Sequence, residues 1–227
     1  MNLNSKNISP QIIYLLNPHP HPHHIRYKES RYLYMNLAMR ELLNLPTGII
    51  IEGKRLSEIK PDGTEFFEGL HQQEERVIQR QTSVFLLITA HFGKEPRLQP
   101  TIVDIHPFFD ETGQLMGSLA EVRECQFFSP LDYIQGKSPK TLKTSFPNTM
   151  LTQRELDIIF YFSQGFSQKE VAEYLHLSRR ALDNKLMEIY EKMEVHHQEE
   201  FKKYIEERGL NRCIPLHLLA LDIRVIG

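Results

Sequence analysis

The chain has 227 residues, enough for two small domains, and its 41% hydrophobic and 25% charged residues are ordinary for a globular protein. The formal net charge of -2 excludes a generic binder of polyanions, and no apolar run approaches the ~18 residues of a transmembrane helix. The N-terminus lacks the basic and long apolar regions of a signal peptide, and Cys125 and Cys213 are the only cysteines. We therefore expect a cytoplasmic protein with free thiols and no membrane contact.

Residues 1–19 form a polar N-terminal segment, in which residues 12–16 fit either a short strand or a short helix docked on the first domain. A run of prolines and histidines over residues 18–24 leads from this segment into the first domain, with four histidines: His19, His21, His23 and His24. Imidazole is a common metal ligand, but prolines stiffen the chain as extended polyproline and hinder a closed tetrahedral shell. We therefore predict an exposed loop here and no metal site.

Residues 20–126 alternate between strand and helix patterns. The predicted elements, in order, are a hairpin around residues 28–30, a helix capped by Asn36, a helical turn at 56–59, a helix at 66–80, and strands at 82–92, 100–109 and 115–125. The last three strands predict an antiparallel meander that carries Phe85, Leu87, Ile102, Val103 and Ile105, with one face closing an apolar core or pocket.

Residues 30–36 resemble the second strand and first helix of PAS domains, and residues 110–113, followed by Gly117, resemble their last hairpin. The resemblance implies a sheet with flanking helices that senses a signal, dimerises or does both, and that can hold a small-molecule ligand. A related GAF-like sensor fold is the alternative. Because His91 and His106 stand alone on their strands, we expect no cofactor, and the ligand pocket is not located by sequence.

The pattern of residues 149–212 predicts a helical domain with a helix-turn-helix at its centre. A proline-rich linker over residues 127–148 joins it to the first domain and holds a short helix at 131–134. Ser167 and Glu170 form a capping box before a helix over residues 168–174. The residues of this helix and its end that we expect to be buried are Val171, Ala172 and Leu175. Ser178 caps a second helix, whose buried stripe is Leu182, Leu186, Ile189 and Met193.

The opposite face of the second helix carries cations and an amide. Arg and Lys suit guanine edges and phosphates, and Asn suits adenine, so this face can read a major groove. We predict that Arg180 reads a base and that Lys192, further along the helix, neutralises a phosphate. The candidate DNA-binding residues are Ser167, Lys169, Ser178, Arg179, Arg180, Asn184, Lys185 and Lys192.

The stretch from residue 149 to residue 210 resembles, without a gap, the DNA-binding domain of LuxR-type transcriptional regulators. The matching residues include Leu151, Thr152, Arg154 and Glu155 in the first helix, residues 164–167 in the turn, Ala172 and Leu175, Leu177 and Ser178, residues 189–190 and 192–193, and Val195, Gly209 and Leu210. The resemblance implies a four-helix domain that binds double-stranded DNA as a homodimer and can contact RNA polymerase. The chain departs from the family at Ala181 and Leu182, at Lys185, and at Phe201 and Ile205, where small residues usually form the dimer surface. We therefore expect the first domain to hold the homodimer.

The predicted fold class is α+β: a PAS-like antiparallel sheet with flanking helices, then an all-α LuxR-type domain, then an apolar tail at residues 213–227 that docks on a domain or a partner subunit. No phosphate loop, nucleophile elbow or Cys-x-x-Cys motif is present, so we expect no enzyme. Two functions remain open. One is a transcription regulator in which the first domain controls the helix-turn-helix, and the other is an adaptor whose helix-turn-helix no longer binds DNA. The operator, the signal and the direction of regulation do not follow from the sequence.

Overall fold

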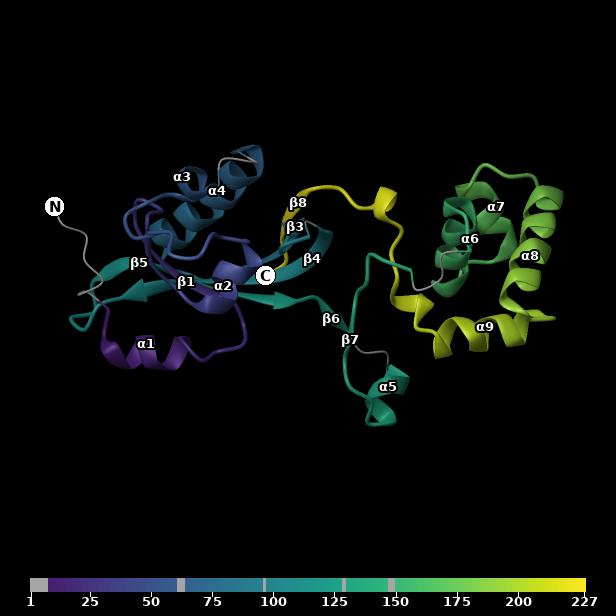
Figure 1. The fold of residues 1–227 in the computed structure, drawn as a ribbon, viewed down its shortest axis with the longest axis horizontal. Helices are drawn as coiled ribbons and strands as arrows, with labels where there is room; N and C mark the ends of the chain where they lie inside the picture. Colours follow the sequence, from purple (N-terminus) through teal and green to yellow (C-terminus); the bar gives the residue numbers. More distant parts are fainter. Residues whose placement is uncertain (1–7, 61–63, 96, 128–129, 147–149) are drawn as a thin grey trace. The chain divides into compact units, whose positions relative to one another are not determined.

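The computed structural model describes residues 8–60, 64–95, 97–127, 130–146 and 150–227 (Figure 1). The chain divides into two compact units. The first unit runs to Cys125 and also includes residues 220–227, and the second comprises the residues between them. None of the helices in the described ranges is long and apolar enough to cross a bilayer.

A six-stranded antiparallel sheet forms the first unit. Its strands are β1 (His23–Tyr27), β2 (Tyr32–Met35), β3 (Val84–Phe92), β4 (Arg97–Phe109), β5 (Leu115–Glu124) and β8 (Asp222–Val225), in the spatial order β2-β1-β5-β4-β3-β8. The predicted hairpin of β1 with β2 and the predicted meander of β3, β4 and β5 are confirmed. The sequence predicted that the tail docks but not that it pairs as a strand, and β8 adds to the edge at β3, where Ile223 lies opposite Ile88.

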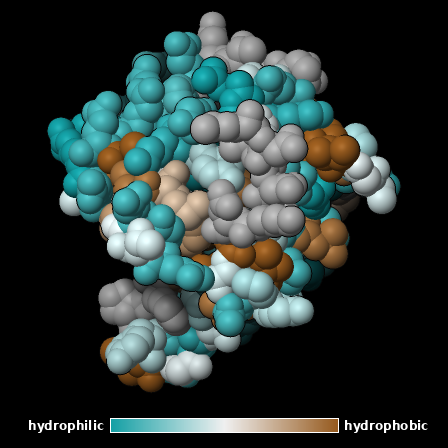
Figure 2. Space-filling view, turned by 90° about the vertical axis from the view of Figure 1, so that its left-hand side faces the viewer, coloured by the Kyte–Doolittle hydropathy of each residue, from teal (hydrophilic) through white to brown (hydrophobic). Residues whose placement is uncertain are grey.

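Helices cover both faces of this sheet (Figure 1). They are α1 (Pro10–Leu16) on one face, and α2 (Leu37–Leu42), α3 (Leu56–Ile59) and α4 (Thr64–Arg80) on the other. Leu16 of α1 packs with Ile25 in a small cluster, whereas Val77 of α4 packs with Leu86 in the larger core. The described surface that faces the viewer in Figure 2 is mainly hydrophilic with scattered hydrophobic residues, so the apolar side chains of this unit gather in the two cores.

The histidine-rich segment differs from the exposed loop that its prolines predicted. His23 and His24 begin β1 and are buried, because β1 pairs with both β2 and β5. The ladder hydrogen bonds available to β1 on both sides outweigh the extended, solvated conformation that the prolines favour. The prediction of an exposed loop is therefore wrong for these two residues.

β1 and β5 also come unusually close opposite Gly117. A Cβ atom at this glycine would lie 1.8 Å from the backbone oxygen of Arg26 and 2.8 Å from its carbonyl carbon. Both neighbours are backbone atoms of the paired strand, so no side-chain movement could relieve the clash. The position therefore requires glycine for close approach of two strands.

The second unit is mainly helical. Its elements are β6 (Gln126–Phe127), α5 (Pro130–Ile134), β7 (Lys140–Thr141), α6 (Gln153–Ser163), α7 (Gln168–Tyr174), α8 (Arg179–Met193), α9 (Gln198–Glu207) and short turns at Leu210–Arg212 and Leu216–Leu218. The segment predicted as a linker thus holds a small hairpin of β6 with β7, and the predicted short helix is present as α5.

Helix α9 turns its large apolar residues inward. Phe201 and Ile205 are buried in the core of the second unit, where Phe201 contacts Phe162 and Tyr190. These two side chains replace the small residues that we associated with a dimer surface. They fill the core of their own domain instead, which removes them from any surface between subunits.

Candidate DNA interface and ligand cavity

The geometry of α7 and α8 is set by caps at both helices. The Ser167 Oγ accepts from Glu170 N at 3.4 Å, and the Glu170 carboxylate accepts from Ser167 N at 2.8 Å. The Ser178 Oγ accepts from Ala181 N at 3.2 Å, which starts α8. Between the helices, Leu177 N donates to the carbonyl of Ala172 at 2.8 Å. These bonds make a short, closed turn, and the predicted helix-turn-helix is confirmed.

The buried stripe of α8 determines which side chains face outward. The predicted residues Leu182, Leu186, Ile189 and Met193 all lie in the core of the second unit. On the other side of the helix, Arg179, Arg180 and Asn184 are exposed. Among the described residues none forms a hydrogen bond or ion pair with these three side chains. Two guanidinium groups and one amide are therefore held at the N-terminal half of α8, free to bind something else.

The other cations of the predicted set have protein partners. Lys185 pairs with Glu188 at 2.6 Å, and Lys169 lies 3.9 Å from Glu173. All four side chains are well exposed to water, so these pairs stabilise little and exchange readily for a phosphate. Ser167 and Ser178 are exposed residues that cap the N-terminal ends of the two helices.

Lys192 occupies a different environment from the one predicted. Its Nζ donates to both oxygens of Glu155 in α6, at 2.7 and 2.8 Å, and Glu155 is buried. Burial raises the pKa of Glu155, but hydrogen bonds from Lys192 and Thr152 outweigh this and hold the pKa below its ordinary value. The ammonium group is therefore part of an internal link between α6 and α8, which would have to break for the predicted phosphate contact.

Met187 is a residue of the exposed face that sequence reasoning missed. It is 64% exposed and lies three residues after Asn184 and seven after Arg180, so it shares their face of α8. An apolar side chain on a reading face can contact the methyl group of thymine. Its spacing from Arg180 would have revealed it, but only charged and amide side chains were sought on that face.

A second candidate site is a cavity of about 450 Å³ in the first unit. It lies between the sheet and the helices on the α2 to α4 face, and most of its lining is apolar, including Leu42, Leu70, Ile88 and Val103. Four of its polar lining residues, His24, Arg26, Tyr32 and Glu74, are buried and form what we call the polar wall; Asn44, Lys60 and His91 also line the cavity. A mostly apolar cavity of this size with a few converging polar groups is typical of a site for a small molecule.

The polar wall is held by one ion pair. Arg26 Nη1 donates to Glu74 at 2.7 Å, Ser30 Oγ donates to the same carboxylate at 3.0 Å, and the guanidinium of Arg26 lies 4.3 Å from the centre of the Tyr32 ring. Burial raises the pKa of Glu74, but the positive charge of Arg26, the neighbouring His24 and the hydrogen bond from Ser30 together outweigh it, and the pKa falls to about 2. The Glu74 carboxylate is therefore charged at neutral pH.

His24 is the residue of this wall whose ring nitrogens are available to a ligand. Burial, reinforced by the charge of Arg26, lowers the pKa of His24 to about 4, so the ring is neutral at pH 7. Its Nε2 lies 3.7 Å from Glu74, too far for a hydrogen bond, and neither ring nitrogen has a hydrogen-bond partner among the described residues. A buried imidazole without a partner can donate to and accept from a bound molecule.

Sequence reasoning did not find this wall. His24 and Arg26 stand two apart in β1 and therefore share a face, and Glu74 stands four residues after Leu70 on the inward stripe of α4. Polar residues at inward positions of two elements were the available signal.

Comparisons with known proteins agree with both halves of this description. Residues 149–204 match the family described as bacterial regulatory proteins, luxR family, and residues 20–126 match the PAS fold. The C-terminal part of the chain is therefore a luxR-type helix-turn-helix domain. The first unit is a PAS fold and not the GAF-like alternative, and the predicted α+β class is confirmed.

Solved structures share the fold of this chain over nearly its whole length. A complex of VqmA from Vibrio cholerae with ligand and DNA is 18% identical, covers 98% of each chain and has a TM-score of 0.72. A complex of a phage VqmA with DPO is 16% identical, covers 96% of this chain and 95% of its own, and has a TM-score of 0.65. A VqmA dimer from Vibrio cholerae without target DNA is 18% identical over 97% of each chain, with a TM-score of 0.51. No curated protein matches the chain.

Proposed function

We propose that this chain is a DNA-binding transcription regulator that acts as a homodimer in the cytoplasm and has no catalytic activity of its own. The observation that carries the proposal is the set of Arg179, Arg180 and Asn184 on the outer face of α8, whose side chains have no partner among the residues that the structure describes. The second helix of a helix-turn-helix enters the major groove and reads bases with its N-terminal residues. The cations of α8 are concentrated in that half, whereas Glu188 and Glu191 lie further along.

Within this proposal the predicted residues divide into two groups. Arg180, Asn184 and Met187 contact base edges, since they lie along the exposed face. Arg179 and Lys185 at its sides, together with Ser167, Lys169 and Ser178, contact phosphates. Phosphate contacts position a protein on DNA and base contacts specify the sequence, so the two groups have separable effects.

The PAS cavity is proposed to hold a small, mainly apolar molecule with at least one hydrogen-bonding group. Its apolar lining would cover the body of the molecule, and His24 would bond the polar group, because burial without a partner costs the ring free energy that a ligand restores. The VqmA structures with a ligand and with DPO, which share the fold, support a ligand in such a chain.

The homodimer is proposed to form through the first unit. Tyr14 and Leu15 of α1 are large apolar side chains that stand largely in water, whereas Phe201 and Ile205 of α9 are buried within one chain. Two-fold operators need two recognition helices about one turn of DNA apart, which a dimer supplies. A structure with the same fold is described as a dimer. RNA polymerase is a further partner under this proposal.

The adaptor alternative explains the polar face of α8 less well. A helix-turn-helix that no longer binds DNA does not require exposed guanidinium groups. Neutral residues, or arginines paired with acidic residues, could stand at these positions without loss of function. Neither the luxR family match nor the structures with the same fold favour an adaptor.

The test begins with selection of genomic DNA fragments by the full-length protein. Arg180→Ala should weaken binding to the selected site by ~1–3 kcal/mol and relax the preference at one base pair, because one side chain reads one base edge. Lys203→Ala, in a surface pair with Glu207 of α9, is the matched control and should bind as the unsubstituted chain does. Full affinity in both Arg179→Ala and Arg180→Ala would exclude this face as the DNA interface.

A further inference from the structure

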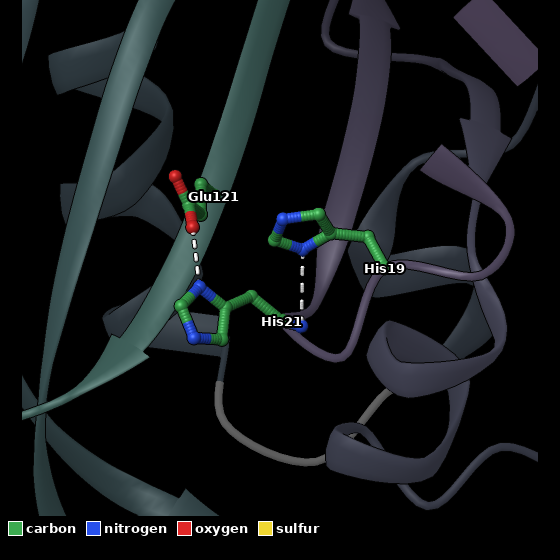
Figure 3. A group of neighbouring side chains, drawn as sticks. All are labelled: His19, His21 and Glu121. Carbon is green, nitrogen blue, oxygen red and sulfur yellow. Dashed lines mark hydrogen bonds and ion pairs between the residues drawn. The ribbon is translucent and has the colours of Figure 1, made fainter. Parts of the chain in front are cut away.

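Two histidines from the segment between α1 and β1 lie beside a carboxylate of β5 (Figure 3). His21 Nδ1 lies 2.5 Å from Glu121, and the ring of His19 accepts a hydrogen bond from the backbone N of His21 at 3.2 Å. One ligand atom from each of His19, His21 and Glu121 lies within 4.8 Å of the other two. These three residues form a compact set of metal-binding side chains outside both sites described above.

The backbone that presents the histidines is fixed by one buried side chain. Asn36 Nδ2 donates to the carbonyls of Leu16, His19 and His21, at 3.2, 3.3 and 2.9 Å. Its Oδ1 accepts from the backbone N of His23 at 2.9 Å. A single amide thus holds three carbonyls and one N–H of the segment, which an exposed, mobile loop would leave to water.

The strand register brings the third group to the same place. His23 lies directly opposite Glu121 in the pairing of β1 with β5, and the carbonyl of Pro22 accepts from Val122 N at 2.9 Å. The Glu121 side chain therefore stands beside the turn that carries His21. The stiffness of the prolines, which counts against a shell made from the loop alone, here keeps two imidazoles on a short frame next to a carboxylate from another element.

The chemistry of the three groups suits a divalent ion of the zinc type. Zinc binds imidazole nitrogen and carboxylate oxygen at ~2.0–2.2 Å, and sites with three protein ligands commonly keep a water in the fourth position. Ligand atoms around such an ion are about 3.4 Å apart by tetrahedral geometry. His21 is 46% exposed and the Glu121 side chain 27% exposed, so both have room to rotate by the ångström or so that this requires.

His23 stands next to this set but is engaged elsewhere. Its ring packs edge-on against that of His19, with centroids 4.5 Å apart, and its Nδ1 lies 2.8 Å from the carbonyl of His21. It therefore orients His19 and leaves coordination to the other three groups, in the way that neighbouring residues commonly orient metal ligands.

We propose that His19, His21 and Glu121 bind one divalent transition-metal ion, with Zn²⁺ the best fit and water in the fourth position. The ion replaces the direct contact between His21 and Glu121 and joins the segment after α1 to β5. This site is independent of the DNA interface and of the cavity.

The test uses the full-length chain, freed of metal with a chelator and titrated with Zn²⁺ against a chromophoric competitor. One tight equivalent of Zn²⁺ is expected. His21→Gln and Glu121→Gln should each weaken it by roughly 100-fold, because each removes one of three ligands. The matched control is His196→Gln, an exposed histidine before α9, which should keep the tight equivalent.

Melting curves of the metal-free chains separate loss of the site from loss of the fold. Because His21 is partly exposed, we expect the metal-free His21→Gln variant to melt at a temperature similar to that of the metal-free unsubstituted chain. Addition of Zn²⁺ should raise the melting temperature of the unsubstituted chain but not that of the variant. Absence of a tight equivalent in the unsubstituted chain overturns the assignment. Equal zinc affinity in the His21→Gln, Glu121→Gln and His196→Gln chains also overturns the assignment. The contact between His21 and Glu121 would then be an ordinary surface ion pair.

Discussion

The two lysines of α8 allow a direct test of which cations serve the fold and which serve DNA. Lys192→Met keeps the length and apolar stem of the side chain but removes the ammonium group from Glu155. Hydrogen bonds to a charged group contribute about 1.5–3 kcal/mol each in buried sites. The Lys192 side chain is 34% exposed and Glu155 keeps its bond from Thr152 N at 2.7 Å, so water and the cap recover part of the loss.

We therefore expect Lys192→Met to lower the free energy of unfolding of the second unit by about 1–2 kcal/mol, which corresponds to roughly 4–16 °C in its melting temperature. Calorimetry of the full chain measures this, and hydrogen exchange of α6 and α8 identifies the transition. The slope of log affinity for DNA against log salt should stay unchanged. Lys185→Met, whose partner Glu188 is half exposed, should show the reverse pattern: unchanged melting and a slope reduced by about one phosphate contact. A reduced salt slope with unchanged melting in Lys192→Met would refute this division.

Three further predictions concern the first unit. Gly117→Ala should destabilise it by about 3 kcal/mol or more, because the added Cβ meets the backbone of Arg26, and circular dichroism melts will show whether it does. Ile223→Asp should weaken the unit by about 1–2 kcal/mol in calorimetry, since this side chain of β8 packs on the core, whereas Val225→Asp in the same strand, at an exposed position, should change little. Acid should destabilise the unit in two steps. The pKa of His24 is about 4 in the fold against an ordinary value of 6.5, so stability should fall between pH 6.5 and pH 4, with a loss of about 2 kcal/mol at pH 5. The pKa of Glu74 is about 2 in the fold against 4.5, so stability should fall further below pH 4.5. In His24→Gln the loss between pH 6.5 and 4.5 should disappear, and a pH profile identical to that of the unsubstituted chain would contradict the first step.

Local patterns made most of the helix-turn-helix predictable. A cap at Ser167, a second at Ser178 and a buried stripe on α8 depend only on residues within a few positions of one another, and the structure has each where the spacing predicted it. The hairpin of β1 with β2 and the meander followed from alternation and turns in the same way. The exposed face of α8 was predictable because it is the complement of a buried stripe.

Contacts between distant residues were not predictable. Lys192 and Glu155 are 37 positions apart, and a lysine at the margin of a polar face looks the same in sequence whether it meets a phosphate or a buried carboxylate. Arg26 and Glu74 likewise pair across 48 positions. Phe201 and Ile205 form an apolar stripe on α9, and the sequence pattern predicts this stripe. Whether the stripe faces the core of its own domain or a partner subunit depends on how α9 packs, which the pattern does not predict. The prolines near His23 predicted an extended, stiff loop, but strand pairing determined the burial of His23 and His24.

The return of the tail to the sheet as β8 makes the second unit an insertion between two strands of the first. A domain attached by a single linker explores a sphere around one anchor, whereas this one is a closed loop with both ends on the same sheet. Closing such a loop costs conformational entropy, and opening it restores that entropy. The pairing of β8 with β3 therefore fixes the second connection between the two units. Loss of the pairing between β8 and β3 would leave the second unit attached to the first by one connection instead of two.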